Sequence, residues 1–203
     1  MSYLLDGMLG KLTRWLRMLG YEASYENDRT DENLLAIAKE RSLILLTSDE
    51  ELYRTATFRG IQSFLVQGKT EPDRLAELAE RYNIRLEIDT SKSRCPRCGS
   101  ELEQASKETV ESSVPPATFK MYETFWVCTN SECAKIYWQG SHWKKIEETL
   151  RSAKRILELK SNAHNQQGET DSSRRGITGP NRTASDHDLP KIKKVHPAAE
   201  SNY

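Results

Sequence analysis

The pattern of apolar and polar positions changes character twice along the chain. In the first part, short strands are predicted over residues 2–6, 22–25, 43–46, 62–66 and 84–88, of which 2–6 and 43–46 are typical of buried strands. Between them, apolar residues recur at three- and four-residue intervals and predict helices over about residues 8–19, 30–41, 48–57 and 70–82. Strand and helix alternate without hairpin signals. Residues 1–90 are therefore predicted to form a small α/β domain, a parallel sheet with helices on both faces.

Two of these helices carry recognisable start signals. Thr70 is followed by Pro72 and by an acid three residues on, which is typical of a capped helix start. Ser48 can cap the helix that follows the third strand.

After residue 90, paired cysteines, aromatic residues and short turns replace the α/β pattern. A helical or loop excursion is expected near residues 107–113, and a helix capped by Ser141 is predicted from His142 to about Leu159. Beyond residue 160, the chain has few large apolar residues and no periodicity. We therefore predict a second module over residues 91–160, a zinc ribbon with a basic helix, and a disordered tail over residues 161–203.

Composition and charge narrow the class of protein without naming its function. Hydrophobic residues make up 36% of the 203 residues, a low share that fits the predicted tail. Residues 1–90 carry 12 Lys and Arg against 16 Asp and Glu, whereas residues 91–160 carry 12 against 9. Neither excess by itself indicates a polyanionic partner. No apolar run has the length of a membrane span and no signal-peptide pattern is present, so a cytoplasmic location is expected.

The four cysteines form the most specific motif. Two residues lie between Cys95 and Cys98, four lie between Cys128 and Cys133, and 29 lie between the two pairs. Each pair can turn two thiolates toward one tetrahedral zinc ion, and four thiolates leave no open position, so the zinc is expected to be structural. A redox pair is the alternative, but a redox motif needs no second pair.

Carboxylates gather near the predicted strand ends and helix starts. Asp6 and Asp49 each follow a strand, Asp31 begins a helix, and Asp28 lies just before it. Ligands of parallel sheets bind beyond the carboxyl ends of the strands, and converging carboxylates need a cation such as Mg²⁺ or Mn²⁺ among them. Taken singly, Asp31 and Asp49 can equally be helix caps. Asp6 closes a buried strand where capping is not expected to give its carboxylate a partner, which favours the metal site.

Basic and aromatic residues provide a candidate surface for nucleic acid. Lys11, Arg14 and Arg17 follow one another at three-residue spacing and can grip phosphates, or can simply be a solvated helix face. Trp138, His142 and Trp143 lie among lysines, a combination on which single-stranded nucleic acid stacks, although small ribbons also use aromatics as their core.

Several separate segments resemble one known family. They are LLDGMLGKLTRWLRMLGY, NDRTDENLL, ILLTSDEEL, RCPRCGSELE and IYWQGSHW, and together they are similar to the Mut-seven C-terminal RNase domain family over about residues 3–150. The resemblance implies a PIN-like nuclease fold joined to a zinc ribbon. It also implies a ribonuclease whose Mg²⁺ or Mn²⁺ is held by Asp6, Asp31 and Asp49, with Asp28 as a fourth acid.

The same resemblance implies RNA as the partner and structural zinc on the four cysteines, with Lys11 and Arg14 at backbone phosphates. The chain departs from the family at two points. The nuclease part is short and no clear fourth acid follows the predicted strand 62–66, and the second cysteine pair is wider than the usual two-residue spacing. Two other interpretations stay open: a non-catalytic RNA-binding adaptor built on the ribbon, and a structural partner protein that uses zinc only for folding.

Overall fold

The computed structural model describes residues 1–25 and 30–172, with side chains described as far as residue 162. Within them, the main sheet is parallel, with strand order β2–β1–β3–β4. Its strands are β1 (Ser2–Leu5), β2 (Glu22–Tyr25), β3 (Ile44–Thr47) and β4 (Ser63–Leu65). The predicted parallel sheet is confirmed, and β1 and β3 are neighbours at its centre.

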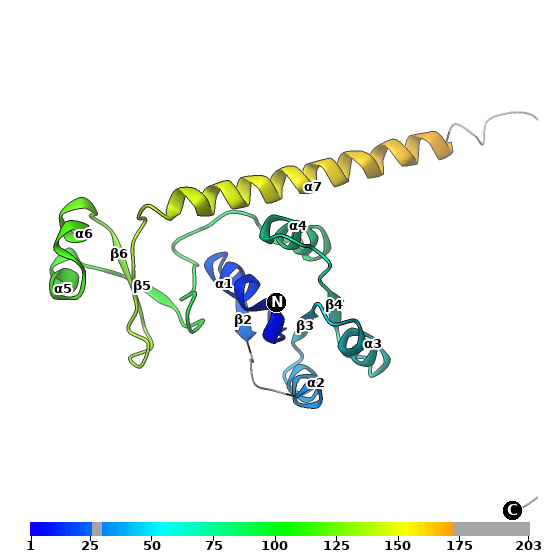
Figure 1. The fold of residues 1–203 in the computed structure, drawn as a ribbon, viewed down its shortest axis with the longest axis horizontal. Coiled ribbons are helices and arrows are strands. Elements are labelled where there is room, and N and C mark those ends of the chain that lie inside the picture. The colour runs from blue at the N-terminus through cyan, green and yellow to red at the C-terminus, as the bar shows by residue number, and fades with distance from the viewer. Residues whose placement is uncertain (26–29, 173–203) are drawn as a thin grey trace, which may run out of the picture. The chain divides into compact units, whose positions relative to one another are not determined.

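Helices cover both faces of this sheet, as the alternating pattern predicted (Figure 1). One face packs against α1 (Gly10–Met18), α4 (Glu71–Tyr82) and α7 (Trp143–Ser172), and the other against α2 (Asp31–Glu40) and α3 (Glu50–Phe58). Successive side chains of a strand point to opposite faces. Leu5 is therefore buried with α1 and α4, whereas Leu4 is buried with α2 and α3, which explains why the central strands β1 and β3 are mostly apolar.

The helices begin where local capping chemistry starts them. Thr70 and Asp73 form a reciprocal capping box at α4, as the sequence predicted. At α3 the prediction is wrong by one residue, because the N-cap is Asp49 and not Ser48. The Asp49 carboxylate accepts two backbone N–H bonds from the first turn, at 2.7 and 3.0 Å.

The predicted strand over residues 84–88 is wrong. Ile84 and Leu86 are buried in the same core as α1 and α4, while Arg85 between them is exposed. The backbone N–H of Arg85 donates to the Tyr21 hydroxyl at 3.0 Å. The alternation therefore belongs to an extended segment that lies on the core without pairing to a strand of the described chain.

A second sheet is antiparallel, with the order β5 (Leu102–Ala105), β6 (Phe125–Cys128) and β7 (Ile136–Tyr137). The expected excursion between the cysteine pairs is present as α5 (Lys107–Val110), η2 (Glu111–Ser113) and α6 (Pro116–Met121). It covers one face of this sheet, where Val110 and Phe125 are buried together. The cysteine cluster beside this sheet is compatible with the predicted zinc ribbon.

The last described helix, α7, returns to the first core. Leu150 and Ala153 are buried with residues of α1 and α4, and Lys160 pairs with Glu80 of α4 at 3.0 Å. α7 runs to Ser172, beyond the predicted end near Leu159. The prediction ended the helix too early because the last turns are polar and show no apolar stripe. Residues 173–203 of the predicted tail lie outside the described residues. In the part of the chain that is described, no helix combines the length and the apolar character needed to cross a membrane.

Candidate active site and metal centre

Asp6 lies at the carboxyl edge of the sheet and has partners of its own. Its Oδ1 accepts the Met8 N–H at 2.8 Å, while its Oδ2 accepts the Thr47 hydroxyl and the Ser48 N–H, the latter at 3.3 Å. The carboxylate thus caps the single 3₁₀ turn that follows it. The expectation that capping leaves Asp6 without a partner is therefore wrong, and burial alone does not require a cation there.

Thr47, which is fully buried, connects the two acids of the central strands. Its hydroxyl donates to Asp6 and accepts the backbone N–H of Asp49 at 2.9 Å. Because β1 and β3 pair directly, Asp6 and Asp49 follow neighbouring strands at one edge, as predicted. Thr47 was not predicted as a site residue, although ILLTSDEE carries the signal for it, a hydroxyl residue between the apolar run and the acids.

The other predicted acids differ in what they contact. Asp49 is exposed, and its Oδ2 accepts no hydrogen bond from the described residues. Asp31 is exposed at the first position of α2, which Thr30 caps. Asp28 lies outside the described residues. Within the described chain, the acids are not gathered into a set of three ligand atoms within 4.8 Å of one another, unlike the cysteines.

The four predicted cysteines are brought together, with all their sulfur atoms within 4.8 Å of one another. The Sγ atoms of Cys95 and Cys133 are 3.7 Å apart, and those of Cys98 and Cys128 are 3.4 Å apart. A tetrahedral ion with Zn–S bonds of about 2.3 Å holds its ligands about 3.8 Å apart. The donor set and its spacing therefore fit a metal such as zinc.

The surroundings shift the pKa values of these thiols in different directions. Burial opposes ionisation at Cys98, but hydrogen bonds with Ser100 and with the neighbouring thiols lower its pKa to about 6. Burial raises the pKa of Cys128 to about 12. Without a cation, the cluster thus shares protons unequally, and a bound cation is what makes four thiolates stable together.

Arg17 does not belong to an exposed basic stripe, and the prediction for it is wrong. It is 8% exposed, and its Nε donates to the Ala23 carbonyl at 2.8 Å. Its Nη1 donates to the carbonyls of Arg97 at 2.9 Å and of Pro96 at 3.3 Å, in the turn between the first two cysteines. Gly99, with a φ of +85°, keeps this approach open, since a Cβ there would lie 3.0 Å from Arg17 Nε. Arg17 thus ties the first cysteine turn to α1.

A basic hollow of 690 Å³ lies beside Asp6. Met8, whose N–H binds the Asp6 carboxylate, is one of its walls. Six cationic side chains line it: Lys11, Arg14, Arg17, Lys69, Arg74 and Arg97. The exposed side chains of Lys11 and Arg14 are therefore confirmed as neighbours on one surface. The sequence analysis missed Lys69, Arg74 and Arg97 because they come from a loop, a different helix and the cysteine turn.

Glu71 is the carboxylate of this hollow. It is the first residue of α4, the helix after β4, so a carboxylate lies beyond the fourth strand, where no clear fourth acid was predicted. Its Oε1 lies 3.4 Å from Arg74 Nη1, and its Oε2 is buried without a hydrogen bond from the described residues. A buried acceptor without a donor is costly, which marks this oxygen as a candidate ligand or proton acceptor. Glu71 was not predicted as a site residue because it lies two residues before the capping-box Asp73, where acids are common at helix starts.

The predicted aromatic residues separate into different surroundings. Trp138 packs against Phe125 on the face of the second sheet that α5 and α6 cover. His142 is exposed just before α7. Trp143 is half-buried, and its Nε1 donates to Glu147 at 2.9 Å.

Comparison with known proteins adds one finding. A family model described as Mut7-C RNAse domain matches residues 1–150. No curated protein and no solved structure matches the chain. The matched residues include the parallel sheet, the basic hollow and the four cysteines.

Proposed function

The chain belongs to the Mut7-C RNAse domain family, and from this premise we propose that it is a metal-dependent ribonuclease that hydrolyses RNA phosphodiester bonds. The reaction takes place at the carboxyl edge of the parallel sheet. Zinc on the four cysteines stabilises the second module, which helps to bind the RNA. A cytoplasmic location fits this function.

The observation that carries the proposal is the basic hollow beside Asp6. A hollow with six cationic side chains attracts a polyanion. Met8, Tyr25 and Lys69 in its wall lie at or beyond the ends of β1, β2 and β4, and parallel sheets bind ligands beyond the carboxyl ends of their strands. Lys11 and Arg14 are exposed there and bind backbone phosphates of the RNA. Arg17 is excluded from this role because its guanidinium is occupied by backbone carbonyls.

Asp6, Asp31 and Asp49 would hold Mg²⁺ or Mn²⁺. Carboxylate oxygens are the donors that these ions take, and all three residues follow strands or begin helices at one edge of the sheet. When bound, the ion supplies an activated water and neutralises charge on the phosphate. Asp28 remains the candidate for a fourth acid on sequence grounds alone.

The chain's own groups have distinct tasks in this proposal. Thr47 keeps the Asp6 carboxylate oriented, because its hydroxyl donates a hydrogen bond to that carboxylate. The Oδ2 of Asp49 points its lone pairs to no donor of the described chain and is free to bind. Glu71 is assigned the proton of the attacking water, because it is the carboxylate that lines the hollow in which the phosphate binds.

The test is cleavage of end-labelled single-stranded RNA by the zinc-loaded full chain in the presence of Mn²⁺. We expect cleavage that is lost when Mn²⁺ is omitted and when Asp49 is changed to Asn. Glu50→Gln is the matched control, since Glu50 is the exposed neighbour of Asp49 and pairs with Arg54 at 3.0 Å. Cleavage that survives Asp49→Asn contradicts the assignment, and the fragment ladder distinguishes endonuclease from exonuclease action.

A non-catalytic RNA-binding adaptor is the second candidate. It is favoured by one observation, that the acids of the described chain are not gathered into one ligand set. Under this interpretation the same assay gives no cleavage with any divalent ion, while the RNA is still retarded in a gel and Lys11→Glu with Arg14→Glu abolishes the retardation.

A further inference from the structure

We propose that an aromatic cavity between the second sheet and α7 binds one unpaired base of the RNA. The inference rests on the proposed function and deepens it, because it assigns to the second module a defined part of the substrate.

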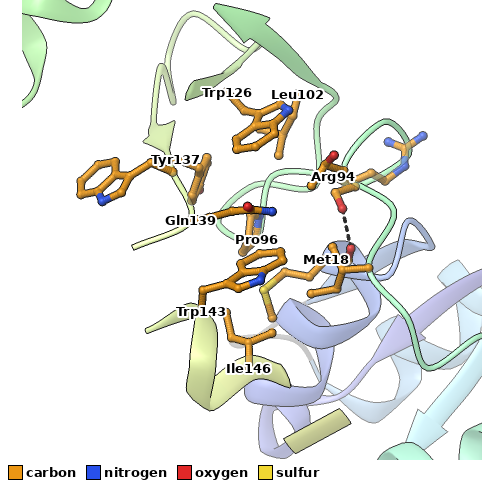
Figure 2. A pocket seen from close by; sticks show the side chains of 13 residues that line it. Met18, Arg94, Pro96, Leu102, Trp126, Tyr137, Gln139, Trp143 and Ile146 are labelled. Carbon is orange, nitrogen blue, oxygen red and sulfur yellow. Dashed lines mark hydrogen bonds between the residues drawn. The ribbon is translucent and has the colours of Figure 1, made fainter. Parts of the chain in front are cut away.

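The cavity has a volume of about 120 Å³. That is roughly ten times the space that one water molecule needs, so it has room for a planar ring. Figure 2 shows Trp126 and Leu102 of the second sheet on one side of it and Trp143, Ile146 and Met18 on the other. Three separate parts of the chain, the second sheet, α7 and the end of α1, thus supply an apolar wall each.

Trp126 and Trp143, two of the aromatic side chains in the cavity, are not part of the core of the second sheet, whereas Trp138 lines the cavity and also packs in that core. Trp126 and Tyr137 are paired residues of β6 and β7 and therefore point to one face. The core of this sheet lies on its other face, where Phe125 packs with Val110 and Trp138. Trp126 and Trp143 remain half-buried instead of closing on each other. Half-buried indole rings in the wall of an open cavity are suited to stacking a base.

One polar group is placed to read the edge of such a base. Gln139 is exposed, lines the cavity, and its side chain makes no hydrogen bond with the described residues. An amide offers both a donor and an acceptor, and bases present both on their edges. The hydroxyl of Ser93, by contrast, already donates a hydrogen bond to the Met18 carbonyl at 2.7 Å, the dashed line in Figure 2.

The cavity adjoins the basic hollow, which indicates why the ligand is RNA. Pro96 is a wall of both spaces. Its carbonyl is held by Arg17, and the next residue, Arg97, belongs to the hollow. An RNA strand whose phosphates lie in the hollow therefore passes close to the cavity, because only Pro96 separates the two spaces there. Cationic backbone contacts next to an aromatic platform are the combination by which proteins bind single strands.

The experiment uses the zinc-loaded full chain and a set of short RNAs, each with one abasic nucleotide at a different position. Binding is measured by fluorescence anisotropy in Ca²⁺ to prevent cleavage. We expect one position at which the abasic change weakens binding about ten-fold. Trp143→Leu removes this difference between the RNAs, whereas Trp143→Phe, which keeps a ring, retains part of it.

Three results overturn the inference or separate it from the proposed function. Equal binding of all the abasic RNAs overturns it and leaves RNA binding intact. A position-dependent loss that persists in Trp143→Leu places the base elsewhere and also overturns it. If no RNA binds, the proposed function fails. A titration with free adenosine monophosphate then tests base binding in the cavity by itself. The expected result is quenching of tryptophan fluorescence, which Trp143→Leu reduces, and no quenching overturns the inference.

Discussion

Arg17→Met removes the link between α1 and the first cysteine turn while keeping a side chain of similar length and helix propensity. Burial lowers the pKa of Arg17, but a guanidinium remains charged at neutral pH. The change thus deletes a buried charge together with its donors and leaves the carbonyls of Ala23, Pro96 and Arg97 without their partner.

The magnitude follows from these contacts. The two short bonds, at 2.8 and 2.9 Å, contribute together about 3 to 6 kcal/mol if each has the value of a hydrogen bond to a charged group. Removing the buried charge also removes its desolvation cost, which offsets part of the loss. We therefore expect a destabilisation of about 3 kcal/mol.

The assay is urea unfolding of the zinc-loaded chain, followed by tryptophan fluorescence. With a slope of about 2 kcal/mol per molar urea, the midpoint falls by about 1.5 M. Arg14→Met is the matched control, because Arg14 is exposed one turn earlier on the same helix, and its free energy of unfolding changes by no more than about 0.5 kcal/mol. Equal midpoints for the two variants would refute the role assigned to Arg17.

Three further predictions concern the acids and one loop. Glu71→Gln slows RNA cleavage at least about 100-fold without weakening RNA binding in a filter assay; equal losses in both would make Glu71 a binding residue only. Thr47→Val removes the donor to Asp6 and lowers the free energy of unfolding by about 1 to 3 kcal/mol in urea titrations, whereas Thr47→Ser retains most of it. Hydrogen bonds from Ser91 and Lys92 lower the pKa of exposed Asp89 to about 2 from its usual 3.8. Its stabilising effect is therefore complete above pH 4 and is lost as the pH falls toward 2, so thermal unfolding of Asp89→Asn differs from the parent above pH 4 and converges with it near pH 2.

The elements that the sequence predicted well are those whose signal is local. The apolar run ending at Thr47 is buried on both faces, so its composition alone indicated a central parallel strand. The capping box of Thr70 satisfies backbone groups within four residues and was equally readable. Cysteine spacing predicted the sulfur cluster because two tight turns can each present two thiolates whatever lies between them.

The errors came from contacts between distant parts of the chain. Residues 84–88 can form a strand only if a neighbouring strand pairs with them. Their alternation of apolar and polar residues does not reveal whether such a neighbour exists, and the described chain provides none. Arg17 looked like Lys11 and Arg14 in sequence, and it differs because the Ala23 carbonyl and a turn almost eighty residues away hold its guanidinium. The basic hollow draws residues from α1, α4 and the cysteine turn, so its extent required the tertiary fold.

The return of α7 to the first core determines how the chain is threaded. The chain leaves that core at Ile88 and rejoins it at Ile146, and the side chains of both residues line one cavity. The cysteine module is thus spliced into the α/β unit, and its two ends lie close together, as they do in domains that evolution inserts or exchanges whole. A truncation after residue 90 would uncover the side of the core that Leu150 and Ala153 fill. Replacing the module by a short Gly-Ser connection would keep that cover and yield an α/β unit without its zinc-binding part.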